Sequence, residues 1–167
     1  AQETLIKSGG IPYSIVHATQ FFEFVPRIAD DFTVGTEVRV PPVLFQPIAA
    51  EDVAKTVGTV AVGTPLNGTL EVGGPQQLRF DEVMRRALAA RKDARGVIAD
   101  PGARYFGARL EDRSLIRGGG AQVGDITLAE YLADIAAAKR GGRDAERTME
   151  LAHHRLDARD ACRTADQ

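Results

Sequence analysis

The stretch IPYSIVHATQFFEF, residues 11–24, decides the fold class. Residues 13–18 are rich in β-forming residues, and the adjacent Ile15 and Val16 give a strand two apolar faces, which is typical of a buried parallel strand. The eight residues at the start of the chain have helical composition, and the two glycines after them can adopt the left-handed conformation that ends a helix. A helix, a glycine stop and a buried strand form half of a βαβ unit. The sequence therefore predicts an α/β fold, with the first strand of this unit upstream of the sequence.

Helices and short strands alternate along the rest of the chain. We expect Thr19 to cap a helix over 20–31, in which Pro26 makes a kink or starts a second turn. The other expected helices cover 51–62, 80–92 and 127–139, and the expected strands cover 37–41, 44–48, 69–72 and 97–99.

Proline and capping residues refine these expectations. Three prolines in or beside the strands at 37–41 and 44–48 predict edge or interrupted strands, because proline cannot donate to a sheet ladder. Thr127 and Glu130 have the spacing of a capping box at the start of the last helix. Beyond Gly142 the sequence is rich in charged residues and alanine, so we expect residues 141–167 to form a charged tail, either helical or disordered.

Composition excludes several classes of function. The chain has 167 residues, of which 44% are hydrophobic and 26% charged, so it can bury a core. Its net charge of -2 gives no support to binding of nucleic acid or anionic membranes. No apolar run is long enough to span a bilayer, and no signal peptide is recognisable. The single Cys162 forms neither an internal disulfide nor a thiolate metal site, which favours a reducing, cytoplasmic location.

Motifs for phosphate, metal or nucleophilic chemistry are weak. The glycine runs 73–74 and 118–120 are interpreted as turns, because neither lies in a phosphate-binding context. No Gly-x-Ser-x-Gly occurs. Neighbouring His153 and His154 would diverge by about 100° on a helix, so we expect no metal site. His17 ends the expected strand, where it is either a structural histidine or part of a binding crevice.

Acidic and aromatic residues leave alternatives open. Glu51 and Asp52 favour a helix N-terminus rather than an acid/base pair. Glu23 can face a ligand or the solvent. Three phenylalanines at positions 21, 22 and 24 cannot share one helical stripe, so either one faces a pocket or neighbouring element, or the core takes all three.

Several segments, taken in order, resemble the distal part of NmrA-like atypical short-chain dehydrogenase/reductases. They are residues 11–24, QPIAAEDVA at 46–54, LEVGGP at 70–75, YFGA at 105–108 and Ser114-Leu115. The resemblance runs from residue 1 to about 136. It departs from the family at His17, where the corresponding run usually has Arg, and it does not extend to the tail.

The resemblance implies a doubly wound, Rossmann-like parallel sheet with a small substrate-side lobe, residues 1–140 being the distal part of an NAD(P)-binding domain. It implies NAD or NADP as cofactor and a small-molecule substrate. The glycine fingerprint and the Tyr-x-x-x-Lys pair of the family would lie upstream, so no catalytic residue can be assigned. Of the site residues, it implies Ala18, Thr19, Gln20 and Phe21 beside the nicotinamide, and it makes pocket candidates of His17, Phe24, Phe45 and Gln46.

Three functions remain open at this stage. The chain can supply the nicotinamide-side wall and the substrate lobe of an NAD(P)-dependent oxidoreductase, it can belong to a non-catalytic dinucleotide-binding redox sensor, or it can be an inactive remnant. We expect weak or absent cofactor binding by this chain alone, because the pyrophosphate-holding helix N-terminus is not in it. We also expect self-association through the unpaired strand.

Overall fold

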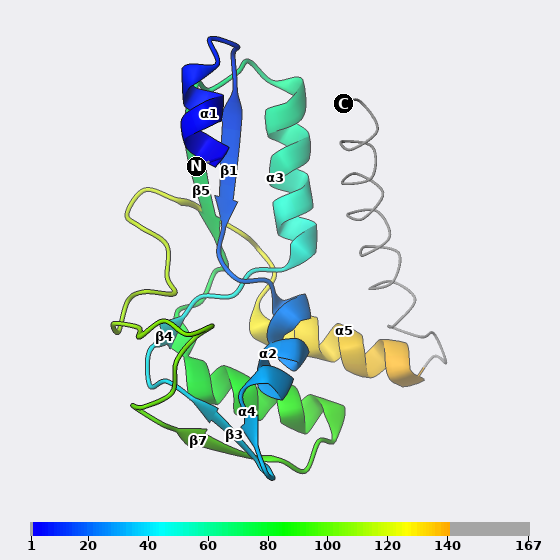
Figure 1. Ribbon diagram of the computed structural model, residues 1–167. Helices are drawn as coiled ribbons and strands as arrows, with labels where there is room; N and C mark the ends of the chain where they lie inside the picture. The colour runs from blue at the N-terminus through cyan, green and yellow to red at the C-terminus, as the bar shows by residue number, and fades with distance from the viewer. Residues whose placement is uncertain (1, 141–167) are drawn as a thin grey trace, which may run out of the picture.

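A computed structural model describes residues 2–140 of the chain (Figure 1). Its helices are α1 (Gln2–Ser8), the 3-10 turn η1 (Phe22–Phe24), α2 (Val25–Asp31), α3 (Ala50–Val62), α4 (Phe80–Arg91) and α5 (Leu128–Arg140). Its strands are β1 (Ser14–Ala18), β2 (Thr33–Val34), β3 (Glu37–Val40), β4 (Leu44–Phe45), β5 (Gly68–Gly73), β6 (Leu78–Arg79), β7 (Gly96–Ala99) and β8 (Gln122–Val123). The expectations for the tail, for the histidine pair at 153–154 and for Cys162 lie outside the described residues.

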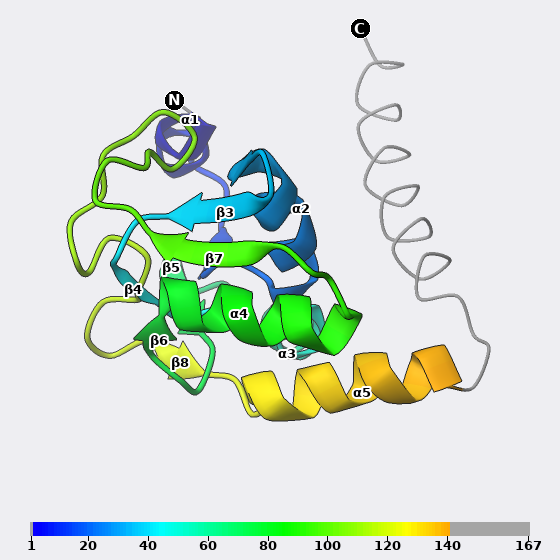
Figure 2. The same ribbon diagram turned by 90° about the horizontal axis from the view of Figure 1, so that it is seen from below.

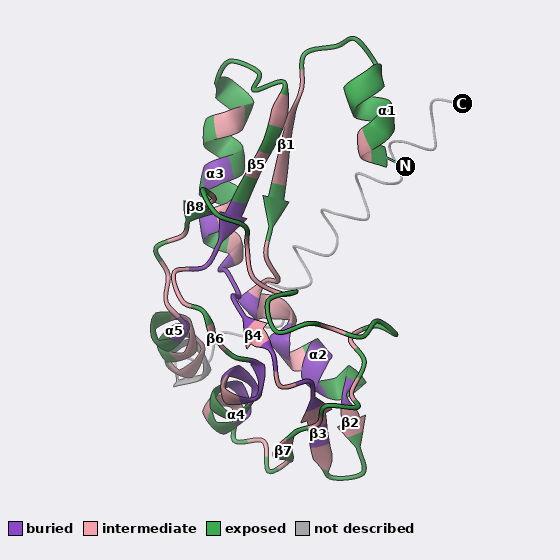
Figure 3. Cartoon of the chain, turned by 90° about the vertical axis from the view of Figure 1, so that its left-hand side faces the viewer, coloured by how far each residue is buried: buried purple, intermediate pink, exposed green. Residues whose placement is uncertain are grey.

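The first layer of the fold is a parallel sheet with the order β1-β5-β8. β1 runs beside β5 in a register that joins Ser14 to Gly68 and Ala18 to Val72. α1 and α3 lie on opposite sides of this sheet (Figures 1 and 3). The predicted α/β fold with parallel strands and helices on both faces is therefore confirmed.

The position of β1 within the sheet differs from the prediction. Its residues are half-buried or exposed, and none is buried. Among the described residues β1 pairs only with β5, so its other edge is free. α1 beside it buries no residue. The apolar pair in β1 correctly predicts a parallel strand, but a deeply buried strand needs neighbours that residues 2–140 do not provide.

The hydrophobic core lies in a second layer, below the parallel sheet. β3 is the central strand of the sheet β2-β3-β7, and its Val38 and Val40 are fully buried. α4 lies across this sheet (Figure 2) and buries Phe80 and Met84. Of the two alternatives predicted for residues 37–41, the edge strand is wrong, because β3 lies between β2 and β7. The strand ends at Val40, before the first proline, as the interrupted alternative expects.

The segment after β1 also differs from the predicted continuous helix. Residues 19–21 are extended, and Phe21 forms a parallel bridge with Ile48. Thr19 is therefore not a helix cap: the 3-10 turn η1 starts three residues later, after Phe21. Pro26 lies in the first turn of α2, which confirms its helix-starting alternative. The helices predicted at 51–62, 80–92 and 127–139 are confirmed, and so are the strands at 69–72 and 97–99.

The end of α4 and the start of α5 follow the sequence signals. Lys92 has the left-handed conformation that ends α4. At α5, the Thr127 N–H donates to Glu130 Oε2 at 2.8 Å, and the Glu130 N–H donates to Thr127 Oγ1 at 3.3 Å. The predicted capping box is therefore confirmed.

Gly74 is not the plain turn residue that the sequence suggests. A Cβ atom at this position would overlap the carbonyl oxygen of Pro47 and would lie 2.8 Å from its carbonyl carbon. The two backbones therefore pass each other at a distance that only glycine permits.

We predict that Gly74→Ala lowers the free energy of unfolding by about 3 kcal/mol or more, because backbone atoms cannot yield as a flexible side chain can. Gly58→Ala is the matched control. Gly58 lies inside α3 with open space around it, so alanine should raise stability by roughly 0.5–1 kcal/mol. Urea denaturation of both variants measures this. Equal effects of the two substitutions would contradict the close approach of the backbones at Gly74.

We further predict that the free edge of β1 makes the chain self-associate at high concentration, because an unpaired strand edge can pair with another chain. Sedimentation velocity over a concentration series measures the association. Ile15→Lys should suppress it, since an edge lysine opposes strand pairing. A monomer at all concentrations, with strong amide protection across residues 14–16, would contradict the prediction.

Candidate functional site

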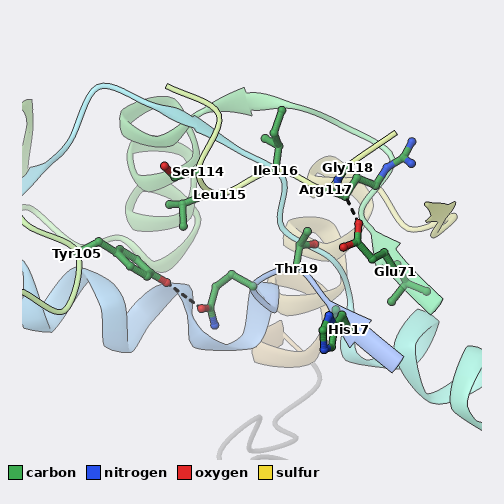
Figure 4. Close-up of a pocket in the computed structure, with 12 residues that line it drawn as sticks. His17, Thr19, Glu71, Tyr105, Ser114, Leu115, Ile116, Arg117 and Gly118 are labelled. Carbon is green, nitrogen blue, oxygen red and sulfur yellow. Dashed lines mark hydrogen bonds between the residues drawn. The ribbon is translucent and has the colours of Figure 1, made fainter. Parts of the chain in front are cut away.

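A cavity of about 290 Å³ lies at the carboxyl ends of the parallel strands β1 and β5 (Figure 4). Ligands of open α/β sheets bind in this position, outside the carboxyl ends of the strands. The cavity is lined by three segments and one aromatic residue: His17, Ala18, Thr19, Gln20, Glu71, Val72, Tyr105, Ser114, Leu115, Ile116, Arg117 and Gly118.

The residues after β1 are held in place by backbone hydrogen bonds. The Thr19 N–H donates to the Val72 carbonyl at 3.0 Å, which continues the ladder to β5. The Gln20 carbonyl accepts from the Ile48 N–H at 3.0 Å, and the Phe22 N–H donates to the Ile48 carbonyl at 2.9 Å. Residues 19–22 are therefore clamped between β5 and residue 48.

Buried Gln46 holds the opposite wall, which is the loop 114–118. Its side chain is only 2% exposed, and its Nε2 donates to the Gly74 carbonyl at 2.7 Å. Its Oε1 accepts from the Arg117 N–H at 3.2 Å. In addition, the Gly118 N–H donates to Glu71 Oε2 at 3.2 Å, as the dashed line in Figure 4 shows. Gln46 and Glu71 thus tie the loop to the end of β5.

Two polar atoms on residues that line the cavity are buried without a partner among the described residues. They are the hydroxyl oxygen of Thr19 and Nε of Arg117. The Arg117 side chain is otherwise engaged, because its Nη1 donates to the Ala121 carbonyl at 2.6 Å. A buried polar atom without a hydrogen bond costs stability, so these two atoms are candidates for contact with a bound polar group.

Tyr105 places a phenol at the edge of the cavity. Its hydroxyl donates to Gln20 Oε1 at 2.8 Å (Figure 4). Burial raises the pKa of the Tyr105 phenol above its usual value, because a charged phenolate is poorly solvated there. The hydroxyl therefore stays protonated at neutral pH.

His17 lies at the outer rim, on the side of α1. Its Nε2 lies 2.7 Å from Glu3 Oε1, and both side chains are nearly half exposed. The hydrogen bond from His17, and after it that from Lys7, lowers the pKa of the Glu3 carboxyl. The contact joins α1 to the end of β1, and solvent screening keeps its contribution to stability small.

The structure separates the site residues proposed from the sequence into three groups. His17, Ala18, Thr19 and Gln20 line the cavity described above. Phe24 lines a second cavity nearby, and Phe21, half-buried, stacks on Phe24 with ring centroids 5.9 Å apart. The remaining two are buried, Gln46 behind the loop and Phe45 in the core.

Phe45 requires a correction. It is 0% exposed and packs on Phe80 with ring centroids 4.4 Å apart, so it faces neither cavity. Its place in β4, which pairs with β6, turns the ring toward α4. The sequence did not identify Glu71, Arg117 or Gly118 as site residues. Arg117 and Gly118 belong to the loop 114–118, which reaches the cavity only through long-range hydrogen bonds, one of them to Glu71.

Two acidic residues that the sequence singled out, Glu23 and Asp52, have structural partners. Both carboxylate oxygens of Glu23 accept from the Ala50 N–H at 3.2 Å, at the start of α3. Burial raises the pKa of the Glu23 carboxyl, although backbone hydrogen bonds oppose the shift. Asp52 is 4% exposed and accepts from the backbone of residues 125 and 126. Residues 2–140 contain no cluster of three or more His, Cys, Asp or Glu side chains that could hold a metal ion.

Comparisons with known proteins give little further information. The sequence matches no protein-family model and no curated protein. Among solved structures the chain is similar to RMD from Pseudomonas aeruginosa, which was solved in complex with NADPH. The TM-score is 0.46 and the identity 13%, over 80% of this chain. The chain spans about half, 49%, of the length of that protein. In the part of the chain that the structure describes, no helix is long and apolar enough to cross a membrane.

We predict that Gln46→Leu lowers the free energy of unfolding by about 2–4 kcal/mol, because the substitution leaves the Gly74 carbonyl and the Arg117 N–H without a partner. Gln46→Glu should cost less at low pH, where the protonated carboxyl can donate to the Gly74 carbonyl and accept from the Arg117 N–H, than at neutral pH, where a buried carboxylate would face that carbonyl. Thermal and urea denaturation give the order of the three proteins. A stable Leu variant that has changed only in ligand binding would contradict the structural role and make Gln46 a pocket residue.

Proposed function

We propose that the chain supplies the nicotinamide-side wall and the substrate lobe of an NAD(P)-dependent oxidoreductase of the short-chain dehydrogenase/reductase type, similar to the NmrA-like group. The observation that carries the proposal is the cavity at the carboxyl ends of β1 and β5, lined by residues 17–20, which end β1 and directly follow it. These residues belong to the first of the segments whose order carries the sequence resemblance.

The residues present fit the nicotinamide end of a dinucleotide. A carboxamide both donates and accepts hydrogen bonds, and two residues that line the cavity, Thr19 and Arg117, each carry a buried polar atom that has no partner among the described residues. These two residues would hold the carboxamide. In residues 2–140 no strand leads through a Gly-x-Gly-x-x-Gly loop into a helix, so these residues do not provide the helix N-terminus that binds the pyrophosphate. When bound, the cofactor supplies the hydride.

The chain's own polar residues orient groups and hold protons. Tyr105 keeps its proton at neutral pH and directs it to Gln20, which fixes the orientation of the Gln20 amide. Glu71 holds the loop 114–118 through Gly118 and so keeps the cavity wall in place. None of these residues is assigned as catalytic.

A non-catalytic dinucleotide-binding sensor is the second candidate. The observation that favours it is the raised pKa of the Tyr105 phenol, which lines the cavity. A phenol of raised pKa releases its proton less readily, which opposes its use as an acid/base group. Binding without turnover needs only the cavity and its hydrogen-bonding groups.

We predict that this chain alone binds NADH or NADPH weakly, with a Kd of about 1 mM or above, because the contacts to the pyrophosphate are not provided. Amide shifts in NMR titrations should concentrate at residues 18–20 and 114–118. Thr19→Val should weaken this binding by about fivefold to tenfold through the loss of one hydrogen bond. It should leave the melting temperature unchanged or raised, because the hydroxyl has no partner among residues 2–140.

Thr56→Val is the matched control, since Thr56 is also buried but donates to the Asp52 carbonyl at 3.0 Å, away from the cavity. It should lower stability and leave binding unchanged. Micromolar binding by the wild-type chain, or shifts that avoid residues 18–20 and 114–118, would mean that the cofactor site lies elsewhere.

A further inference from the structure

A second cavity of about 260 Å³ lies beside the first, and Gln20 lines both. It is bounded on one side by η1 and α2 and on the other by the turn at residues 105–108. An engineered apolar cavity of about 150 Å³ is large enough for benzene, so this space can take one substituted aromatic ring. Its lining residues are Gln20, Phe24, Arg27, Ile28, Asp31 and Phe106.

Phe106 has a backbone conformation that is unfavourable for a bulky side chain. The N–H groups of Tyr105 and Ala108 each donate to the other residue's carbonyl at 2.9 Å, which closes a two-residue hairpin. Phe106 and Gly107 both have positive φ, at 46° and 86°, which is the pattern of a type I′ turn. Such turns favour Asn or Gly at the first central position, and a bulky residue there is strained.

Burial does not offset this strain, because Phe106 is 69% exposed. An aromatic ring kept at a strained and exposed position, at the wall of a cavity, points to a contact outside the chain. The ring is nevertheless held in a defined place, since it packs edge-on against Tyr105 with centroids 4.7 Å apart.

The walls of this cavity select for an uncharged aromatic group. Phe24 is supported by stacking on Phe21, as Phe106 is by Tyr105. Ile28 adds buried apolar surface. The two charged residues, Arg27 and Asp31, carry opposite charges 4.0 Å apart, so the cavity lining has no net charge. Offset or edge-on contacts with Phe24 and Phe106 would each favour an aromatic ring over a saturated one.

Gln20 adds a polar element between the two cavities. Its Oε1 accepts a hydrogen bond from the Tyr105 hydroxyl, so the amide NH₂ is the donor that Gln20 can offer to a ligand. In the described chain no hydrogen bond engages this NH₂. A carbonyl oxygen attached to an aromatic ring in the second cavity would be an acceptor of the right chemistry for it.

We propose that the second cavity binds the uncharged aromatic ring of an aryl carbonyl compound, with Phe106 closing over the ring opposite Phe24 and Gln20 donating to the carbonyl oxygen. That this compound is the substrate rests on the proposed function; that the cavity binds it does not.

The test uses the full chain without any dinucleotide, with acetophenone and cyclohexyl methyl ketone as the probes. These two ketones differ in the aromaticity of the ring. Saturation-transfer NMR and amide-shift titration should show tighter binding of acetophenone, with shifts at Phe24, Gln20 and Phe106. Phe106→Asn should weaken acetophenone binding by about fivefold or more, which corresponds to the loss of one aromatic contact. It should also raise the melting temperature, because Asn suits the turn.

Phe106→Tyr is the matched control, since it keeps the ring and should keep the binding. Weaker binding in an Asn variant that is more stable than the wild type cannot come from unfolding. Equal affinity for the two ketones, or equal acetophenone affinity in the wild type and the Asn variant, would overturn the proposal. Neither result bears on the dinucleotide titration, which reports on residues 18–20 and 114–118, so the two proposals can fail separately.

Discussion

The close approach of two backbones at Gly74 and Pro47 is the constraint on which the site depends. Because no Cβ fits at Gly74, residues 46–48 can run directly between the end of β5 and the extended residues 19–22. Gln46 then reaches both Gly74 and Arg117, and Ile48 binds the backbone on either side of Phe21. The close approach at Gly74 and Pro47 therefore fixes both the extended residues 19–22 and the loop 114–118 that forms the cavity wall. A side chain at position 74 would disturb both.

Residues 46–48 lead directly into α3, so the same close approach positions the start of this helix. The first turn of α3 in turn holds the segment that leads into α5. Asp52, in the first turn of α3, accepts from the N–H groups of Asp125 and Ile126 at 3.0 and 2.9 Å. The sequence favours a role for this carboxylate at the helix N-terminus. Its burial and these two bonds show that it also fastens the segment before α5 to α3. The Nζ of Lys55 lies 3.8 Å from Asp52 Oδ1 and is a positive charge close to this carboxylate.

Sequence reasoning succeeded where a local signal determines the structure. The apolar pair in β1, the acids at the start of α3 and the capping box of α5 all predicted their elements. It failed where a distant segment overrides the local preference. Thr19 resembles a helix cap, but pairing with residue 48 keeps its neighbours extended. The loop 114–118 has no local sequence signal for a place at the cavity, because hydrogen bonds with the distant residues Gln46 and Glu71 hold it there.

The three phenylalanines after β1 show how the core and the second cavity are connected. Phe22 is buried and stacks on Tyr131 with centroids 4.9 Å apart, whereas Phe21 and Phe24 stack on each other outside the core. The cluster is thus divided between core and cavity, although the division arises from an extended Phe21 followed by a 3-10 turn and not from the continuous helix that the sequence predicted. On the opposite wall, Phe106 is joined to the core through Tyr105, which packs on Phe80 at 6.1 Å. Both aromatic walls are therefore anchored in the core before any ligand arrives, and preorganised walls reduce the entropy lost on binding.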